Sequence, residues 1–200
     1  MSVPKILVTG FGPFPGAPEN PSADLARFLA RSKRAARFAK VSAAVIPTTY
    51  KDAAALPRLI KMKKPDAVLM FGLAGKARVL RIETCGRNHA SFLHKDEAGV
   101  KGRRRLLRGA PSVLCVTAPV RELLRRARRT GAKARLSSNA GGYVCNAAIF
   151  HALHATRGKA SPLIAFVHIP LPRGRAAMAA LQRAGEAILI ALAQAAGAKR

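Results

Sequence analysis

Cys145 stands where a short flexible segment meets a helix-forming run. Glycine and small polar residues fill Ser138–Gly142, and apolar residues at helical spacing follow the cysteine. A cysteine at a helix start meets unpaired backbone N–H groups and the positive end of the helix dipole, which favour the thiolate. We therefore expect Cys145 to be a nucleophile whose thiol has a pKa below the ordinary value of about 8.5. The alternative is a buried cysteine that acts only as a small apolar residue.

Two further side chains suit the same chemistry. The apolar run Leu163–His168 predicts a buried strand that ends in a histidine, and a histidine at a sheet edge can act as a base. Glu83 comes near the end of another predicted strand, Val79–Thr84, in a chain with only nine acidic residues. The alternative for Glu83 is a surface ion pair with one of the many arginines.

The elements that must position these residues alternate between strand and helix. We expect strands at Lys5–Thr9, Val41–Ile46, Asp66–Phe71, Val79–Thr84, Ser112–Thr117 and Leu163–His168. We expect helices after Asn20-Pro21-Ser22, over Asp52–Met62 with an interruption at Pro57, over Val120–Arg129, from Cys145 onward, and from about Arg175 to Ala195. The alternation predicts an α/β fold, a three-layer α/β/α sandwich with a mostly parallel twisted sheet, built as a single domain over residues 1–200.

In such a sheet the loops that follow the strands gather at one edge and form the ligand site. We expect the loops after Thr9, Ile46, Phe71, Thr84 and His168 to meet there. His151 and His154 share a helix face but lack a third ligand at suitable spacing, so we expect no metal site. Cys85 and Cys115 are expected to be packing residues.

Composition restricts the class of protein and its partners. The chain has 200 residues, 36 Lys and Arg, and a formal net charge of +27. Such a charge attracts polyanions, but the basic residues are spread out and no nucleic-acid-binding signature is present. Three widely spaced cysteines form no disulfide framework, and neither a signal peptide nor an apolar run of membrane-spanning length is evident. We expect a cytoplasmic protein without membrane contact.

Four segments expected at the sheet edge form a recognisable set. They are Thr9–Gly16, Gly72–Gly75, the motif Asn139–Asn146 that contains Cys145, and His168-Ile169-Pro170. The set resembles pyroglutamyl peptidase I, or pyrrolidone-carboxylate peptidase, a cysteine peptidase family, across nearly the whole chain.

The resemblance implies a catalytic triad of Cys145 as nucleophile, His168 as base and Glu83 as the orienting carboxylate. It implies hydrolysis of the amide bond after an N-terminal pyroglutamyl residue of small peptides, without a cofactor or metal. It also implies a homo-oligomer, either a dimer or a tetramer.

The substrate site follows from the same resemblance. Phe11 and Phe14 would flank the pyroglutamyl ring, although both could instead anchor their loop in the core. Asn20 would hold this loop or cap the following helix. Leu73 and Val144 complete the expected substrate-binding residues.

Two departures from the family pattern affect the expected activity. Leu73 stands where many members have glutamine, and no arginine lies near Phe92 and Leu93, where many members have one. The loss of one donor to a developing oxyanion costs about 10²–10³ in rate. Backbone N–H groups near Cys145, or Arg87, could substitute. The alternatives are a hydrolase of another small N-terminal amide, and a weakly active or inactive homologue that binds polyanions.

Overall fold

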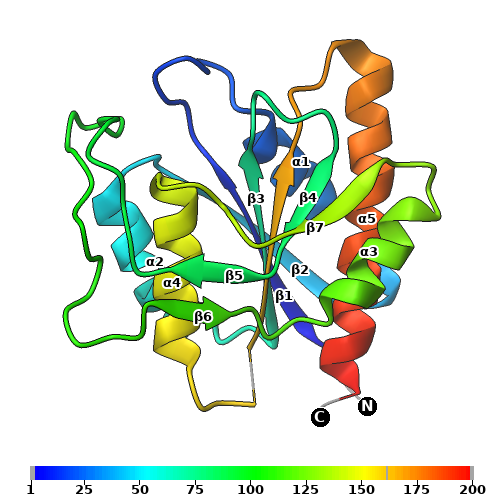
Figure 1. Cartoon of the computed structure of the whole chain (residues 1–200). Coiled ribbons are helices and arrows are strands. Elements are labelled where there is room, and N and C mark those ends of the chain that lie inside the picture. The colour runs from blue at the N-terminus through cyan, green and yellow to red at the C-terminus, as the bar shows by residue number, and fades with distance from the viewer. Residues whose placement is uncertain (1–2, 161, 199–200) are drawn as a thin grey trace.

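The computed structural model describes residues 3–160 and 162–198, which form a sheet covered by helices on both faces (Figure 1). Its strands are β1 (Lys5–Phe11), β2 (Lys40–Ile46), β3 (Ala67–Leu73), β4 (Leu80–Glu83), β5 (Cys85–Arg87), β6 (Val113–Cys115), β7 (Ala134–Ser137) and β8 (Leu163–Ile169). Its helices are α1 (Pro21–Ala30), α2 (Tyr50–Lys63), α3 (Val120–Arg128), α4 (Val144–Thr156) and α5 (Gly174–Gly197), with a short 3₁₀ turn at Ala35–Arg37.

Three layers result from apolar faces on both sides of the sheet. Helices α1, α3 and α5 cover one face, and α2 and α4 cover the other (Figure 1). Alternate residues of each central strand enter opposite cores. In β8, for example, Val167 joins the first core and Phe166 joins the second. The expected three-layer α/β/α sandwich is therefore confirmed.

Strand direction corrects one expectation about the sheet. The order of the six main strands is β2-β1-β3-β8-β4-β7. Strand β8 pairs with β3 in parallel but with β4 in antiparallel, so β4 and β7 run opposite to the rest. The loop after Thr84 therefore does not join the loops that follow β1, β2, β3 and β8. Glu83 instead reaches His168 from β4, the neighbouring antiparallel strand.

Local patterns explain most element boundaries. Asn20 caps α1 by accepting a hydrogen bond from the backbone N–H of Ser22, and Thr49 caps α2 in the same way through Asp52. Helix α2 continues through Pro57, contrary to the expected interruption. Strands β5 and β7 were not expected, because three or four residues are too few to show a period.

Helix α5 corrects the expectation that no segment approaches membrane-spanning length. Among the described residues it is the one helix that is long and apolar enough to cross a membrane. Half of its most apolar window is buried inside the protein, where Ile188, Leu189 and Leu192 pack against the sheet and its neighbouring helices. Its apolar character is thus explained by the core that it covers.

Candidate active site

Cys145 lies in the first turn of α4, as the sequence predicted. Tyr143, the residue that precedes this helix, makes no side-chain capping hydrogen bond, so the first N–H groups of α4 have no side-chain cap. The residue as a whole is half-buried, with its sulfur directed toward the sheet. Its Sγ packs over Gly72 so closely that a Cβ placed on this glycine would lie 2.8 Å from the sulfur.

Gly72 in turn pairs with His168 on the neighbouring parallel strand. The two residues share one face of the sheet, so the sulfur above Gly72 lies on the same face as the imidazole of His168. His168 is one residue inside β8 rather than at its end, and its side chain is almost fully buried. The site is therefore enclosed by the sheet below and by α4 above.

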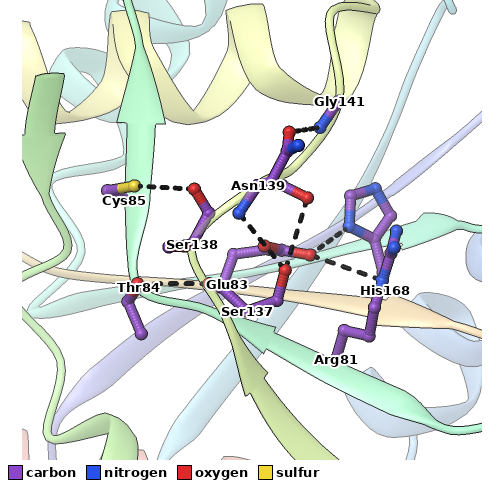
Figure 2. A network of polar contacts seen from close by, with 9 residues as sticks. All are labelled: Arg81, Glu83, Thr84, Cys85, Ser137, Ser138, Asn139, Gly141 and His168. Carbon is purple, nitrogen blue, oxygen red and sulfur yellow. Dashed lines mark hydrogen bonds and ion pairs between the residues drawn. The ribbon is translucent and has the colours of Figure 1, made fainter.

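Glu83 and His168 form a short buried hydrogen bond. The Nδ1 atom of His168 and the Oε1 atom of Glu83 are 2.7 Å apart, and the carboxylate is fully buried (Figure 2). Because the carboxylate accepts, Nδ1 carries the proton in the neutral ring. Nε2 is then left without a proton and is free to accept one from a thiol.

The resting protonation state differs from the expected thiolate. Burial, and then the charge of Glu83, raise the pKa of Cys145 to about 12, against smaller lowering effects of its own backbone N–H and of Arg81. Burial also lowers the pKa of His168, and Glu83 only partly offsets this effect. The helix start thus fails to outweigh desolvation. Both shifts favour a neutral thiol and a neutral imidazole in the resting pair.

Arg81 completes this group, although the sequence reasoning did not select it. It lies directly opposite His168 in the β4–β8 pairing, and its Nε is 3.7 Å from Oε1 of Glu83. That Nε is buried and makes no hydrogen bond to any described residue. Its spacing of two from Glu83 on one strand places both side chains on the same face, and this alternation was the available signal.

An open cavity of about 1200 Å³ adjoins these residues. Phe14, Ala74, Arg81, Leu93 and Tyr143 contribute to its wall. Cys145, His168 and Glu83 do not line this cavity themselves, but Tyr143 precedes α4 and Arg81 lies opposite His168, so its wall reaches the neighbours of the reactive side chains. It is large enough for the first residues of a peptide.

The two expected aromatic residues occupy different environments. Phe11 is 1% exposed and packs in the core, with its ring centroid 6.3 Å from that of Phe166. Phe166 in turn lies 4.8 Å from the His168 ring. Phe14 is partly exposed, lines the cavity, and lies 6.2 Å from the Tyr143 ring. Phe14 can therefore meet a ligand directly, whereas Phe11 supports the floor of the site.

The other three expected substrate residues have no free side-chain group in the cavity. Asn20 both caps α1 and holds the loop, because its Nδ2 donates to the carbonyl of Gly12 at 2.9 Å. Leu73 pairs with Ile169, on the sheet face opposite Gly72 and His168. Val144 is fully buried among the residues beneath α4.

These features accompany a clear match to known proteins. The family model described as pyroglutamyl peptidase matches residues 4–178. The chain belongs to this family. Its members are cysteine peptidases that remove N-terminal pyroglutamate, which agrees with the expected enzyme class.

Sequence relatives and solved structures agree with this membership. A pyrrolidone-carboxylate peptidase of Thermococcus kodakarensis is 34% identical over 175 residues, 86% of this chain and 84% of the relative. One from Deinococcus radiodurans is 34% identical over 171 residues, 84% and 78% of the two chains. The solved structure of the pyrrolidone carboxyl peptidase from Thermococcus litoralis matches with a TM-score of 0.87 at 26% identity, covering 98% and 96% of the two chains.

The arginine that many pyroglutamyl peptidases carry has no replacement in Arg87. The Arg87 guanidinium donates to the carbonyl of Ser138 at 3.2 Å, and this residue does not line the cavity. Leu93 lines the cavity in the segment where the arginine was expected. Arg81 is the arginine that pairs directly with His168 across β4 and β8.

Within the described ranges, no group of three His, Cys, Asp or Glu could hold a metal ion.

Proposed function

We propose that this chain hydrolyses the amide bond after the N-terminal pyroglutamyl residue of peptides, with Cys145, His168 and Glu83 as its triad. The observation that carries the proposal is the 2.7 Å contact between Glu83 and Nδ1 of His168, beside the strand position over which the Cys145 sulfur lies. A nucleophile, a base and a group that orients the base are the parts that acyl transfer requires. The substrate, rather than the peptidase class, comes from the family.

The reaction begins from the neutral pair. Nε2 of His168 accepts the thiol proton as Sγ of Cys145 attacks the pyroglutamyl carbonyl carbon. The imidazolium that forms is stabilised by Glu83 and then donates its proton to the departing amine. Water attacks the resulting thioester with His168 again as base, which releases pyroglutamate and restores the thiol.

The oxyanion of each tetrahedral intermediate needs donors or positive charge. The uncapped N–H groups in the first turn of α4 are the nearest backbone donors to Cys145. Arg81 adds a positive charge on the His168 side of the site. We propose that these two features together replace the missing arginine, with Phe14 contacting the ring.

Hydrolysis of a fluorogenic pyroglutamyl amide tests this function. We expect activity in the wild type under reducing conditions and none in Cys145→Ser, with unchanged circular dichroism. The matching alanyl amide should be left intact, because it lacks the lactam ring. Cleavage of the alanyl amide at a similar rate would favour a hydrolase of another small N-terminal amide.

The surface charge favours polyanion binding in addition. A shallow hollow is lined by Arg103, Arg104, Arg105 and Arg108 without a carboxylate. We propose non-specific, salt-dependent binding of polyanions such as heparin at this surface. Heparin retention together with no hydrolysis of the pyroglutamyl amide would favour an inactive homologue. We further propose that residues 1–200 form a single catalytic domain, that the protein is cytoplasmic, and that it is a dimer or tetramer. Light scattering would test the oligomeric state.

A further inference from the structure

The cavity beside His168 is lined by cations. Lys76, Arg78, Arg81, Lys95 and Arg135 contribute to its wall, and no Asp or Glu does. A pyroglutamyl ring is uncharged, so binding of the ring gives these cations no role. Their position next to the reactive side chains points to a part of the substrate beyond the ring.

Two of these cations form a row with the base. Arg81 lies opposite His168 on one side and pairs in register with Arg135 of β7 on the other. Like charges directly opposite each other on neighbouring strands repel, and an anion between them removes this cost. Arg81 approaches the fully buried Glu83, whereas Arg135 is exposed and makes no ion pair with any described residue. The row thus carries positive charge that the protein itself leaves uncompensated.

We propose that Arg81 and Arg135 select pyroglutamyl peptides with an acidic side chain directly after the bond to be cleaved. This inference rests on the proposed function. A carboxylate in the cavity would meet the guanidinium groups of Arg81 and Arg135, which suit bidentate contacts with carboxylates. Because the cavity is open, each contact is screened by water and salt. The preference should therefore be moderate and should weaken in high salt.

The test uses three pyroglutamyl tripeptide amides that differ only in a central Glu, Gln or Lys. We expect kcat/KM to be about 5- to 10-fold higher for Glu than for Lys at low salt. Arg135→Gln should remove most of this ratio while leaving the Gln peptide nearly unaffected. Arg58→Gln is the matched control, because Arg58 is exposed on α2 and lines a different hollow.

The outcomes separate this proposal from the function on which it rests. Equal kcat/KM values for all three peptides would overturn the acidic preference and leave the peptidase function standing. A Glu preference that survives in Arg135→Gln would overturn the role of the row. Failure to cleave any of the three would contradict the proposed function itself.

An independent feature concerns the two cysteines that the mechanism does not use. Cys85 of β5 and Cys115 of β6 are direct partners in the antiparallel ribbon of these two strands, which lies apart from the main sheet (Figure 1). The N–H of Val116 donates to the carbonyl of Thr84, which makes residues 84 and 116 a hydrogen-bonded pair. Cys85 and Cys115 are therefore a non-hydrogen-bonded pair, in which Cα atoms lie about 4.5 Å apart. A disulfide spans Cα separations of about 4.4–6.8 Å.

The environment of the two thiols differs. Gly86 faces α4, since a Cβ on it would lie 2.8 Å from Cγ2 of Ile149, so its neighbour Cys85 faces the other side of the ribbon. There the Cys85 thiol donates to the carbonyl of Ser138 at 3.3 Å (Figure 2). Cys115 is exposed and Cys85 is buried beside it. An exposed thiol next to a second, resolving thiol is the arrangement of redox-sensitive pairs.

We infer that Cys85 and Cys115 form a reversible disulfide when the protein meets a small-molecule disulfide. The Cys115 thiolate attacks the oxidant, which forms a mixed disulfide and releases one small thiol. The Cys85 thiolate then attacks the Cys115 sulfur and displaces the second small thiol. Two protein thiols are oxidised, one small disulfide is reduced to two thiols, and the hydrogen bond from Cys85 to Ser138 is lost.

Oxidised glutathione followed by trypsin tests this pairing. A cut among the exposed basic residues between Lys101 and Arg108 falls between the two cysteines. On a non-reducing denaturing gel the fragments of the oxidised wild type should stay linked, and they should separate after reduction. Cys85→Ser and Cys115→Ser should both abolish the link, and Cys145 should remain free for alkylation.

A double variant, Cys115→Ser with Val113→Cys, provides the matched control. It moves the thiol to an exposed position opposite Arg87, where only a mixed disulfide with glutathione should form. Accumulation of that mixed disulfide on Cys115 of the wild type would overturn the inference. A link that persists in Cys115→Ser would do the same, because it would join Cys85 to Cys145.

Discussion

Arg81 and His168 lie directly opposite each other across the antiparallel pairing of β4 and β8. Burial is the main cause that lowers the pKa of His168 and raises that of Cys145, and the positive charge of Arg81 adds a smaller lowering contribution to both pKa values. One arginine therefore favours both the unprotonated base and the ionised nucleophile. Removal of this charge should affect the pH dependence of the reaction in a defined direction.

Arg81→Met should shift the acid limb of the kcat/KM profile to higher pH. The imidazole must be unprotonated to accept the thiol proton, and loss of the neighbouring cation raises the His168 pKa. In the wild type this limb should lie below the ordinary histidine value of about 6.5, because burial lowers the pKa. Arg78→Met is the control, since Arg78 lines the cavity without contacting the triad. A shift to lower pH would contradict this arrangement.

Glu83→Gln should lower kcat/KM by about 10²–10⁴-fold, because an amide no longer selects the ring form with the proton on Nδ1. The same change removes a negative charge that raises the Cys145 pKa. Alkylation of Cys145 at neutral pH should therefore become faster while catalysis becomes slower. Rates of iodoacetamide labelling and of hydrolysis check the two effects together. A parallel fall of both would indicate a disrupted fold instead.

The order of thiol labelling follows from exposure. Cys115 is exposed, Cys145 is partly covered and has a pKa raised to about 12, and Cys85 is buried. Iodoacetamide should label Cys115 first under native conditions, which reverses the order expected from a lowered pKa at Cys145. Peptide mapping by mass spectrometry after short exposures gives the order. In Cys115→Ser, the rate at which Cys145 is labelled should still rise as the pH increases beyond about 8.5, the ordinary pKa of a free thiol, because the pKa of Cys145 lies above this value.

Gly72→Ala should reduce activity by at least about 10²-fold, since small misplacements of reacting groups have effects of this size. Its methyl group would lie 2.8 Å from the Cys145 sulfur and 2.8 Å from Cζ of Phe166, so both must move. We expect a stability loss of about 1–3 kcal/mol, as for other overpacked sites. Gly75→Ala is the control, because nothing lies within 4 Å of its added methyl group. Equal activities of the two variants would contradict the placement of Sγ.

Alanine substitutions of Phe11 and Phe14 should affect folding stability and substrate binding separately. Phe11→Ala should cost about 3–5 kcal/mol of unfolding free energy, because its ring is fully enclosed. Phe14→Ala should leave stability nearly unchanged and lower kcat/KM for pyroglutamyl amides about tenfold. Chemical denaturation and steady-state kinetics measure the two effects. If Phe14→Ala keeps wild-type kinetics, Phe14 does not contact the ring.

The layers could be predicted from local signals in the sequence, whereas the candidate triad was implied by the resemblance to the family. Buried strands such as Leu163–Ile169 are continuous apolar runs, and the segment around Cys145 has a distinctive motif. The direction of β4 could not be predicted, since a short apolar strand pairs equally well in either sense. The prediction of a lowered Cys145 pKa was wrong, because desolvation depends on all atoms packed around the sulfur and not on its place in a helix. Arg81 was missed for a related reason: its role depends on the strand that faces it.

The order of strands also has a consequence for biosynthesis. Strand β8 lies between β3 and β4, although it comes last in sequence among the strands of the described residues. His168 and Glu83 are 85 positions apart, and a contact of such long sequence separation forms only after costly loop closure. While the ribosome is still holding residues 163–169, the sheet lacks its central strand and the base is absent. A nascent chain therefore cannot assemble the proposed site before residues 163–169 have left the ribosome.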